Sequence, residues 1–325
     1  MIGAMTRVAV VIPVLNGELT IARAIDSAIA QRFDGEAEVI VVDDGSTDAT
    51  SQILERYRGR IRVVCQDNHG PAAARNAAAT RSTAEYLAFL DADDAFMPNK
   101  LARTVAELEK NRTAVLLFHD AIAVDRAGRE LAQSYVPAWA AHAPSLDEML
   151  ARWWPIVPTT AVMRRATFDT CGGFDEAFKS AGFEDPYLWI RAREHGEFIY
   201  LPEALAAYTL TAPAERSGKY LHSQDLFIRK ITERYGSATA GLIRGTRRGY
   251  ASALGYAGLL AMRDGDRAAA RRYFLQGLRY QPADLKCALR LLKTFLPAPV
   301  ARALSGRTVR TSASVGTPPA ESVRR

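Results

Sequence analysis

The stretch Val39–Thr50, VIVVDDGSTDAT, contains a complete strand–turn–helix signal. Its first four residues form a continuous apolar run, which is typical of a strand that is buried on both faces. Asp43 and Asp44 end this run, and Gly45 permits a tight turn before Ser, Thr and Asp residues that can cap a helix. The stretch therefore predicts a parallel β/α unit whose strand ends in two carboxylates.

The same alternation continues on both sides of this stretch. Apolar runs, each followed by a helical pattern, indicate parallel strands that helices cover on both faces. The expected strands are Val8–Leu15, Val39–Val42, Ile61–Val64 and Tyr86–Leu90. The sequence therefore predicts an α/β fold with a mostly parallel sheet, in which ligands bind beyond the carboxyl ends of the strands.

The chain is expected to divide into three parts. Residues 1–215 hold the α/β pattern, which ends in two short strands near Phe198–Leu201 and Leu205–Thr209. Residues 216–302 have the pattern of a basic helical extension. Residues 303–325, which are rich in Ser, Thr, Pro and Arg, are expected to form a disordered tail.

Within the helical extension, residues 251–284 resemble one tetratricopeptide-type helix pair. Gly258, Phe274 and Pro282 stand at the small, aromatic and proline positions of that repeat. A single pair cannot bury its own apolar face, so we expect it to pack on its neighbours.

Charge is distributed unevenly along the chain. Residues 1–215 contain 21 Lys and Arg and 30 Asp and Glu, so this part is acidic. Residues 216–325 contain 21 Lys and Arg and 6 Asp and Glu, so this part is strongly basic, and the whole chain has a net charge of +6. The basic part indicates anionic partners, but no interleaving of aromatic and basic residues supports nucleic-acid binding.

In Leu285–Leu296, LKCALRLLKTFL, Lys286, Arg290 and Lys293 lie on another helical face than the apolar residues. Such a helix either lies on an anionic membrane surface or packs as an ordinary helix on the predicted pair.

The cysteines and the apolar runs indicate the cellular compartment of the protein. Cys65, Cys171 and Cys287 are far apart, which fits a reducing environment and argues against a disulfide framework or a zinc site. The N-terminal apolar run spans only Val8–Leu15 and is better explained as a strand than as a signal sequence. We expect a cytoplasmic protein, or one held peripherally at the cytoplasmic face of the inner membrane.

Three aspartates follow the strand in Tyr86–Pro98, YLAFLDADDAFMP. Asp91 and Asp93 are two positions apart, so their side chains point to the same side if the strand geometry persists, with Asp94 beside them. Such carboxylates suit Mg²⁺ or Mn²⁺ bound together with a diphosphate. A solvated acidic turn before the next helix is the alternative, because an isolated DxD pattern is common.

A further motif, Asn68–Ala78, NHGPAAARNAA, starts a helix at its Gly-Pro pair and places Arg75 on the first turns. A guanidinium there can reach a phosphate or a base, although an isolated helix arginine is more often solvated. At Asp43 and Asp44, a strand-end carboxylate can accept hydrogen bonds from a base or a ribose, or can simply cap the turn.

Taken together, five motifs resemble those of the inverting family 2 glycosyltransferases with the GT-A fold. They are VVIPVLNGELTIARAIDSAIAQ, VIVVDDGSTD, GPAAARNAA, FLDADD and GGFDEAFKSAGFEDPYLWIRARE, and they span roughly residues 6–210. The resemblance implies a bacterial enzyme that moves a sugar from a nucleotide-sugar, with a UDP-sugar as the first choice, to a hydroxyl of a glycan or lipid-linked acceptor in cell-surface polysaccharide synthesis. No QxxRW signature follows residue 185, which favours addition of a single sugar over polymerisation.

The resemblance also implies donor-binding roles for individual residues. Pro13 and Asn16 would lie against the nucleotide, and Asp44 would bind the uracil. Arg75 would contact the nucleotide, and Asp91 would sit near the ribose and the metal.

For the metal and the chemistry, the resemblance implies that Asp93 is the main ligand of Mg²⁺ or Mn²⁺, with Asp91 beside it. Asp185 would be the catalytic base, and Glu184 would contact the acceptor or orient the base. One base suffices for attack of a hydroxyl on the anomeric carbon, whereas the metal stabilises the leaving diphosphate. A glycosidase would need two carboxylates that flank the bond.

Two other functions are possible for a protein with these motifs. A sugar nucleotidyltransferase also uses a metal and a nucleotide, but it usually has a glycine-rich basic loop where this chain has PVLNGELT. A catalytically silent nucleotide-sugar-binding protein on the same fold is disfavoured by the intact acidic set. The sequence contains no GxGxxG and no GxxxxGK[ST] motif, which excludes the common dinucleotide and P-loop sites.

Overall fold

The computed structural model describes residues 7–179, 182–210, 221–263 and 265–296. The chain divides into two compact units, residues 1–249 and residues 250–325. The first unit extends past residue 215, where the sequence indicated a boundary, and the division into a catalytic domain, a helical extension and a tail stays a prediction. The predicted tail, residues 303–325, lies outside the described residues. None of the helices in the described ranges combines the length and the apolar character needed to cross a bilayer.

In the first unit, nine strands of the described residues form one mixed sheet. Four of them are β1 (Arg7–Val14), β2 (Glu36–Asp43), β3 (Arg62–Cys65) and β4 (Tyr86–Phe89). They are parallel and have the order β3-β2-β1-β4. Because β1 lies between β2 and β4, the strand order reverses there. The loops after these strands therefore flank the position at which open α/β sheets bind ligands.

The other half of the sheet contains antiparallel pairs. Its strands are β5 (Ala95–Phe96), β6 (Ala114–Val124), β7 (Glu130–Ala132), β8 (Ala161–Arg164) and β9 (Glu197–Thr209). β8 pairs antiparallel with β4 and β6, and β9 pairs parallel with β6 and antiparallel with β5. β9 is one strand where the sequence predicted two, because the pairing with β6 continues across register shifts near its middle.

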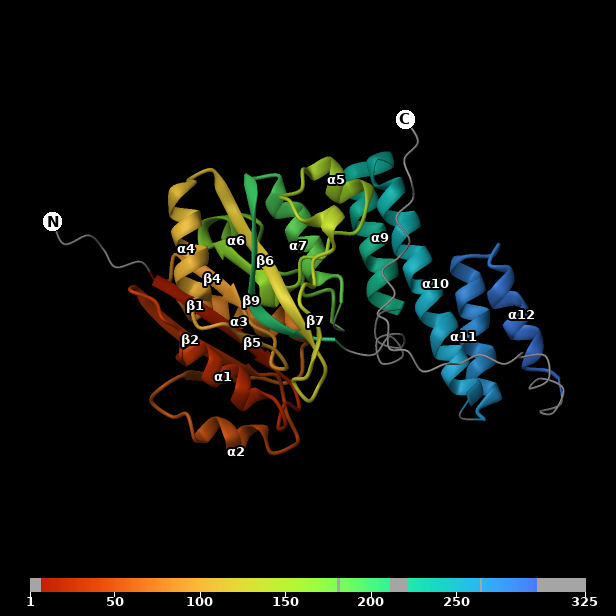
Figure 1. Ribbon diagram of the computed structural model, residues 1–325, viewed down its shortest axis with the longest axis horizontal. Coiled ribbons are helices and arrows are strands. Elements are labelled where there is room, and N and C mark those ends of the chain that lie inside the picture. The colour runs from red at the N-terminus through yellow and green to blue at the C-terminus, as the bar shows by residue number, and fades with distance from the viewer. Residues whose placement is uncertain (1–6, 180–181, 211–220, 264, 297–325) are drawn as a thin grey trace. The chain divides into compact units, whose positions relative to one another are not determined.

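Helices cover both faces of the sheet (Figure 1). One face packs against α1 (Ile21–Ile29), α2 (Thr50–Glu55) and α4 (Lys100–Lys110). The other packs against α3 (Pro71–Thr80), α5 (Leu146–Ala151), α6 (Arg165–Thr170), α7 (Glu184–Arg193) and α9 (Leu221–Tyr235). Along β1, Val8 and Val10 join the first core, whereas Ala9 and Val11 join the second. This two-sided cover confirms the predicted α/β fold class.

Short 3-10 helices connect some of these elements, at η1 (Ala138–Ala140), η2 (Pro158–Thr160) and η3 (Gly236–Thr239). After η3, α10 (Ala240–Arg263) runs into the second unit.

The second unit contains the end of α10, then α11 (Arg267–Tyr280) and α12 (Leu285–Lys293). Ala270, Phe274 and Cys287 form its small core. At Gly258 a Cβ atom would come within 2.5 Å of the Phe274 ring, so only glycine lets α10 approach α11 so closely. The helical extension is thus observed. Its assignment to the tetratricopeptide repeat stays a prediction, and α12 is a third helix beyond the predicted pair.

Candidate active site

The loop that follows β1 is fastened to the loop that follows β2. Asn16 adopts a positive φ of 53°, a conformation that asparagine tolerates better than most residues. Its N–H donates to Ser46 Oγ (2.9 Å), and its Oδ1 accepts from the Thr47 N–H (2.8 Å). Pro13 lies in register with Val42 of β2, shortly before this contact. Pro13 and Asn16 therefore stand at the carboxyl edge of the sheet, in a loop that the next loop holds in place.

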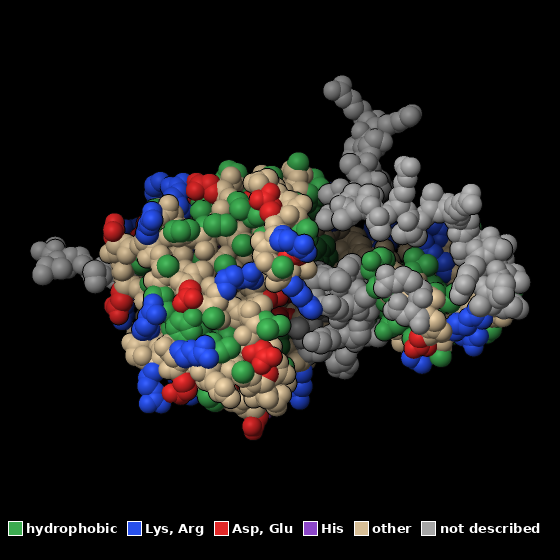
Figure 2. Space-filling model, turned by 60° about the horizontal axis from the view of Figure 1, so that its bottom comes forward, with side chains coloured by type: hydrophobic (Ala, Val, Ile, Leu, Met, Phe, Trp, Pro, Cys, Tyr) green, Lys and Arg blue, Asp and Glu red, His purple; other side chains and the backbone are tan. Residues whose placement is uncertain are grey.

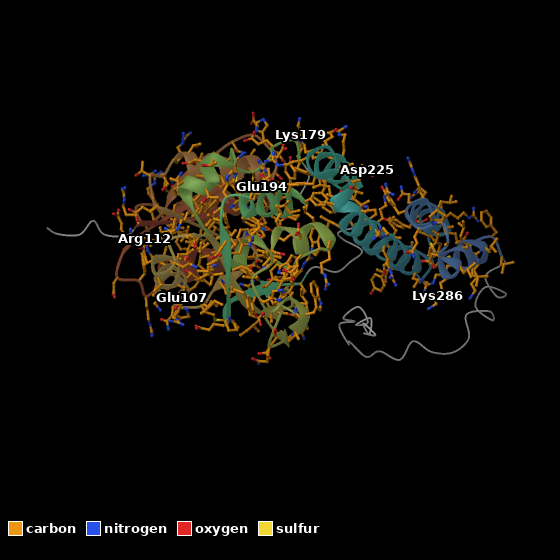
Figure 3. The ribbon with its side chains drawn as sticks, turned by 90° about the horizontal axis from the view of Figure 1, so that it is seen from above. Glu107, Arg112, Lys179, Glu194, Asp225 and Lys286 are labelled. Carbon is orange, nitrogen blue, oxygen red and sulfur yellow. The ribbon has the colours of Figure 1, made fainter. Side chains whose placement is uncertain are left out.

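Asp44 is buried and holds the segment that leads into α3. Its Oδ1 accepts from Gln66 Nε2 (2.7 Å) and the His69 N–H (2.9 Å), and its Oδ2 accepts from the Gly70 N–H (2.8 Å). Gly70 has a φ of +92°, and a Cβ atom there would lie 2.2 Å from the carbonyl oxygen of Lys179, a residue labelled in Figure 3. The carboxylate and the glycine together bring the segment before α7 against the start of α3.

The third aspartate of the acidic turn, Asp94, is bonded into the core of the protein. Asp94 is fully buried, and its Oδ1 accepts from the Thr209 N–H of β9 (2.7 Å). Its Oδ2 accepts from the Thr159 hydroxyl, and the Lys100 ammonium donates to the Thr159 carbonyl. Asp94 thus anchors the turn to the core, where burial and then the charges of Asp93 and Asp91 raise its pKa well above the usual range.

Asp91 and Asp93 remain at the edge of the sheet, each partly exposed. The strand geometry that would place them on one side does not persist, because β4 ends at Phe89 and the Asp94 N–H donates to the Asp91 carbonyl (3.0 Å) in a turn. Burial and then the charge of Asp91 raise the pKa of Asp93 to about 6, against the opposing effect of Arg23 and Arg126. A divalent cation fits this pair, because its charge would offset their repulsion and carboxylate oxygens are the ligands that Mg²⁺ and Mn²⁺ prefer. The described residues contain no group of three or more His, Cys, Asp or Glu side chains arranged to hold a metal.

Arg75 connects the acidic turn to the start of α7. Its Nη2 donates to Asp91 Oδ1 (2.7 Å) and its Nη1 donates to Glu184 Oε1 (2.9 Å), and its guanidinium lies 5.2 Å from the centre of the Phe174 ring. Burial alone would lower the pKa of Arg75, but the charges of Asp91 and Glu184 outweigh it and raise this pKa. The arginine is 5% exposed, so it is not the solvated helix arginine that the sequence left open.

The two acidic residues at the start of α7 have different surroundings. Glu184 is buried, and beside its bond to Arg75 it accepts from the Gly182 N–H (2.7 Å). Asp185 is partly exposed. Burial, followed by the charge of Glu184, raises the pKa of Asp185 well above its usual range, although Arg75 opposes this shift. Glu184 is therefore an ion-paired anchor, and Asp185 has the raised proton affinity that suits a general base.

Several residues that position the site were not singled out from the sequence. Asn76 forms a paired contact with the Phe174 backbone, accepting from its N–H (2.9 Å) and donating to its carbonyl (2.8 Å). Arg23 and Thr209 both donate to the Asp93 carbonyl. Asn76 is the neighbour of Arg75 in the motif NHGPAAARNAA, so the sequence placed it close to the site. No local signal marks Arg23 or Thr209, because their partners are far away in the sequence.

An open α/β sheet with carboxylates at its reversal point, joined through one arginine to a second acidic pair, is the arrangement expected of a glycosyltransferase of the GT-A class. The chain belongs to glycosyl transferase family 2, whose sequence model matches residues 9–174. The enzyme class expected from the five motifs is thereby confirmed.

Named relatives agree with this membership. The chain is 30% identical to EpsE of Bacillus subtilis over 227 residues, which cover 67% of this chain and 78% of EpsE. It is 42% identical over 108 residues to the succinoglycan biosynthesis protein ExoU of Rhizobium meliloti, which cover 32% of this chain and 31% of ExoU. The match to the poly(ribitol-phosphate) β-N-acetylglucosaminyltransferase TarS of Staphylococcus aureus is 30% over 224 residues, or 67% of this chain and 37% of TarS.

A solved structure shares the fold. The crystal structure of residues 1–349 of Staphylococcus aureus TarS aligns with a TM-score of 0.58 at 22% identity, and the alignment covers 94% of this chain and 93% of that one.

Removal of the Arg75 guanidinium tests its bridging role. Arg75→Met leaves Asp91 and buried Glu184 without their cation, so we expect the free energy of unfolding to fall by about 3–5 kcal/mol, measured by urea denaturation. Arg103→Met is the matched control, because Arg103 pairs with Glu203 at the surface, where such a pair contributes less than about 1 kcal/mol. Similar losses in the two variants would contradict the bridging role.

A methyl group at Gly70 tests the contact between α3 and the segment before α7. Gly59 has a similar φ of +81°, but a Cβ atom there would meet nothing within 4 Å, so Gly59→Ala isolates the backbone strain. Gly70→Ala adds the collision with the Lys179 carbonyl, and we expect it to cost about 1–3 kcal/mol more than Gly59→Ala in urea unfolding. Equal costs would show that the close approach does not matter.

Proposed function

We infer that this chain transfers a single sugar from a nucleotide-sugar donor, with a UDP-sugar preferred, to a hydroxyl of a glycan or lipid-linked acceptor, with inversion and with Mg²⁺ or Mn²⁺. The observation that carries this proposal is the bridge from Asp91 through Arg75 to Glu184. It joins a carboxylate pair suited to a metal-bound diphosphate with a second acidic pair that contains a candidate base.

The donor assignment rests on the edge formed by the loops after β1 and β2. Pro13, Asn16 and Asp44 lie there, and Asp44 is held rigidly by three hydrogen bonds. TarS, which shares the fold, has been crystallised with UDP and with UDP-GlcNAc. We assign the nucleotide to this edge, with the uracil next to Asp44, and the diphosphate to the neighbouring edge at Asp91.

Asp93, together with Asp91, would hold Mg²⁺ or Mn²⁺. When bound, the ion supplies positive charge that stabilises the leaving diphosphate. Asp94, Thr159 and Thr209 keep the acidic turn in place, so the two carboxylates do not have to reorganise when the donor binds.

Asp185 would take the proton from the acceptor hydroxyl. Its raised pKa makes it a stronger base than an ordinary aspartate. Glu184 stays bound to Arg75 and fixes the first turn of α7, which carries Asp185. Transfer with inversion follows if this base activates the hydroxyl on the face of the sugar opposite the diphosphate.

The acceptor class is inferred from the relatives. The names of ExoU and TarS refer to succinoglycan biosynthesis and to a poly(ribitol-phosphate) acceptor, both of which are bacterial polymers. We propose that this chain acts in the synthesis of a bacterial cell-surface polysaccharide.

Two isosteric variants separate donor binding from transfer. Asp93→Asn should abolish the metal-dependent part of UDP binding in a calorimetric titration with and without Mn²⁺. Asp185→Asn should bind UDP and Mn²⁺ as the wild type does, while kcat for sugar transfer falls by roughly 10²–10⁴-fold because the base is lost. Near-normal transfer by Asp185→Asn would refute the base assignment, and metal-dependent UDP binding by Asp93→Asn would refute the metal assignment.

The raised pKa of Asp185 also predicts a dependence of stability on pH. Because folding raises this pKa above the unfolded value of about 3.9, ionised Asp185 opposes folding at neutral pH, and the penalty disappears below about pH 4. In metal-free urea unfolding, Asp185→Asn should therefore be more stable than the wild type at pH 8 and equally stable near pH 4. A variant that is less stable at pH 8 would contradict the shift.

A further inference from the structure

The last described helix, α12, exposes a stripe of leucines. Leu285, Leu289 and Leu292 are between 59% and 77% exposed, and Phe295 just after the helix is 62% exposed. The three leucines are four and three residues apart, so they lie on one face of the helix. We call these three residues the leucine stripe.

The opposite face of α12 is already occupied. Cys287 is buried against α11 with Phe274, and partly buried Leu291 packs on the same core. At 100° per residue, Cys287 lies roughly 165° and Leu291 roughly 125° away from the centre of the stripe. The leucine stripe can therefore contact another surface without unpacking α12 from its own unit.

Basic side chains flank the stripe. Lys286 is exposed and is labelled in Figure 3, and Lys293 follows on the same side of the helix two turns later. Arg290 lies further round the helix on the same side, and α12 contains no acidic residue beyond its N-cap, Asp284. On the face of the first unit shown in Figure 2, by contrast, acidic and basic side chains are interspersed. The surface around the stripe is both apolar and cationic.

Charge decides between the possible occupants of the stripe. A second copy of α12 would bring its own Lys286 and Lys293 towards these residues, which is unfavourable for a symmetric interface. The chain beyond α12, residues 297–325, contains five arginines and a single acidic residue, Glu321, so its composition does not complement the charge of the lysines. An anionic lipid surface matches both the leucines and the lysines.

We propose that α12 binds an anionic lipid bilayer, with the leucine stripe at the boundary of the acyl chains and the basic side of the helix, led by exposed Lys286, towards the lipid headgroups. This binding goes beyond the proposed transferase function and does not depend on it. If the transferase proposal also holds, the bilayer brings the chain to a lipid-linked acceptor.

The test is co-sedimentation of the full chain with phosphatidylcholine vesicles that contain or lack phosphatidylglycerol. We expect at least tenfold tighter binding to the anionic vesicles, weakened by salt. The stripe variant Leu285→Gln/Leu289→Gln/Leu292→Gln should lose at least tenfold in binding. The charge variant Lys286→Gln/Lys293→Gln should lose most of the preference for anionic lipid.

Leu275→Gln is the matched control, because Leu275 is a leucine of α11 that is 56% exposed and lies outside the stripe. It should bind vesicles as the wild type does. Circular dichroism of every variant checks that the helices remain folded, and calorimetric titration with UDP reports separately on the transferase proposal.

Two outcomes would overturn the membrane proposal. One is the absence of vesicle binding by the wild type, or binding that the folded stripe variant retains. The other is a wild-type oligomer in light scattering that the stripe variant converts to monomer while vesicle binding is unchanged, which would make the stripe an interface between copies.

Discussion

The double ion pair of Arg75 is the interaction on which the site depends. It joins Asp91, 16 residues away along the chain, to Glu184, 109 residues away, across the first unit. Arg75 and Glu184 are both buried, and a buried charge without a partner costs several kcal/mol, so each depends on the other. Asp91 is partly exposed, and its pairing with Arg75 holds the acidic turn and α7 at one edge of the sheet.

The remaining carboxylates differ in whether the protein supplies hydrogen bonds to them. Asp44 and Asp94 are buried and accept hydrogen bonds from distant backbone N–H groups, so they act as anchors of loops. Burial and neighbouring charges raise the pKa of Asp93, Asp94 and Asp185. Asp94 accepts hydrogen bonds from Thr159 and Thr209 in the core, whereas Asp93 and Asp185 are partly exposed. Groups left in this state often mark functional sites, where a ligand or a substrate supplies the missing partner.

The sequence was sufficient for the features that local patterns determine. Apolar runs and turn residues predicted the parallel strands, the helices on both faces and the accumulation of acidic residues at the carboxyl edge. The inward direction of Asp94 was not predictable, because its partner Thr209 is 115 residues away. The continuity of β9 depends in the same way on its pairing with β6, and the Arg75–Glu184 contact depends on the packing of α7.

The most direct test of the account is the position of manganese in crystals grown with UDP and Mn²⁺, located by anomalous diffraction. We expect one strong peak within coordination distance of the Asp93 carboxylate and of the diphosphate, with Arg75 still bound to Asp91 and Glu184. Manganese and UDP bound elsewhere, with Asp91 and Asp93 facing solvent, would contradict it.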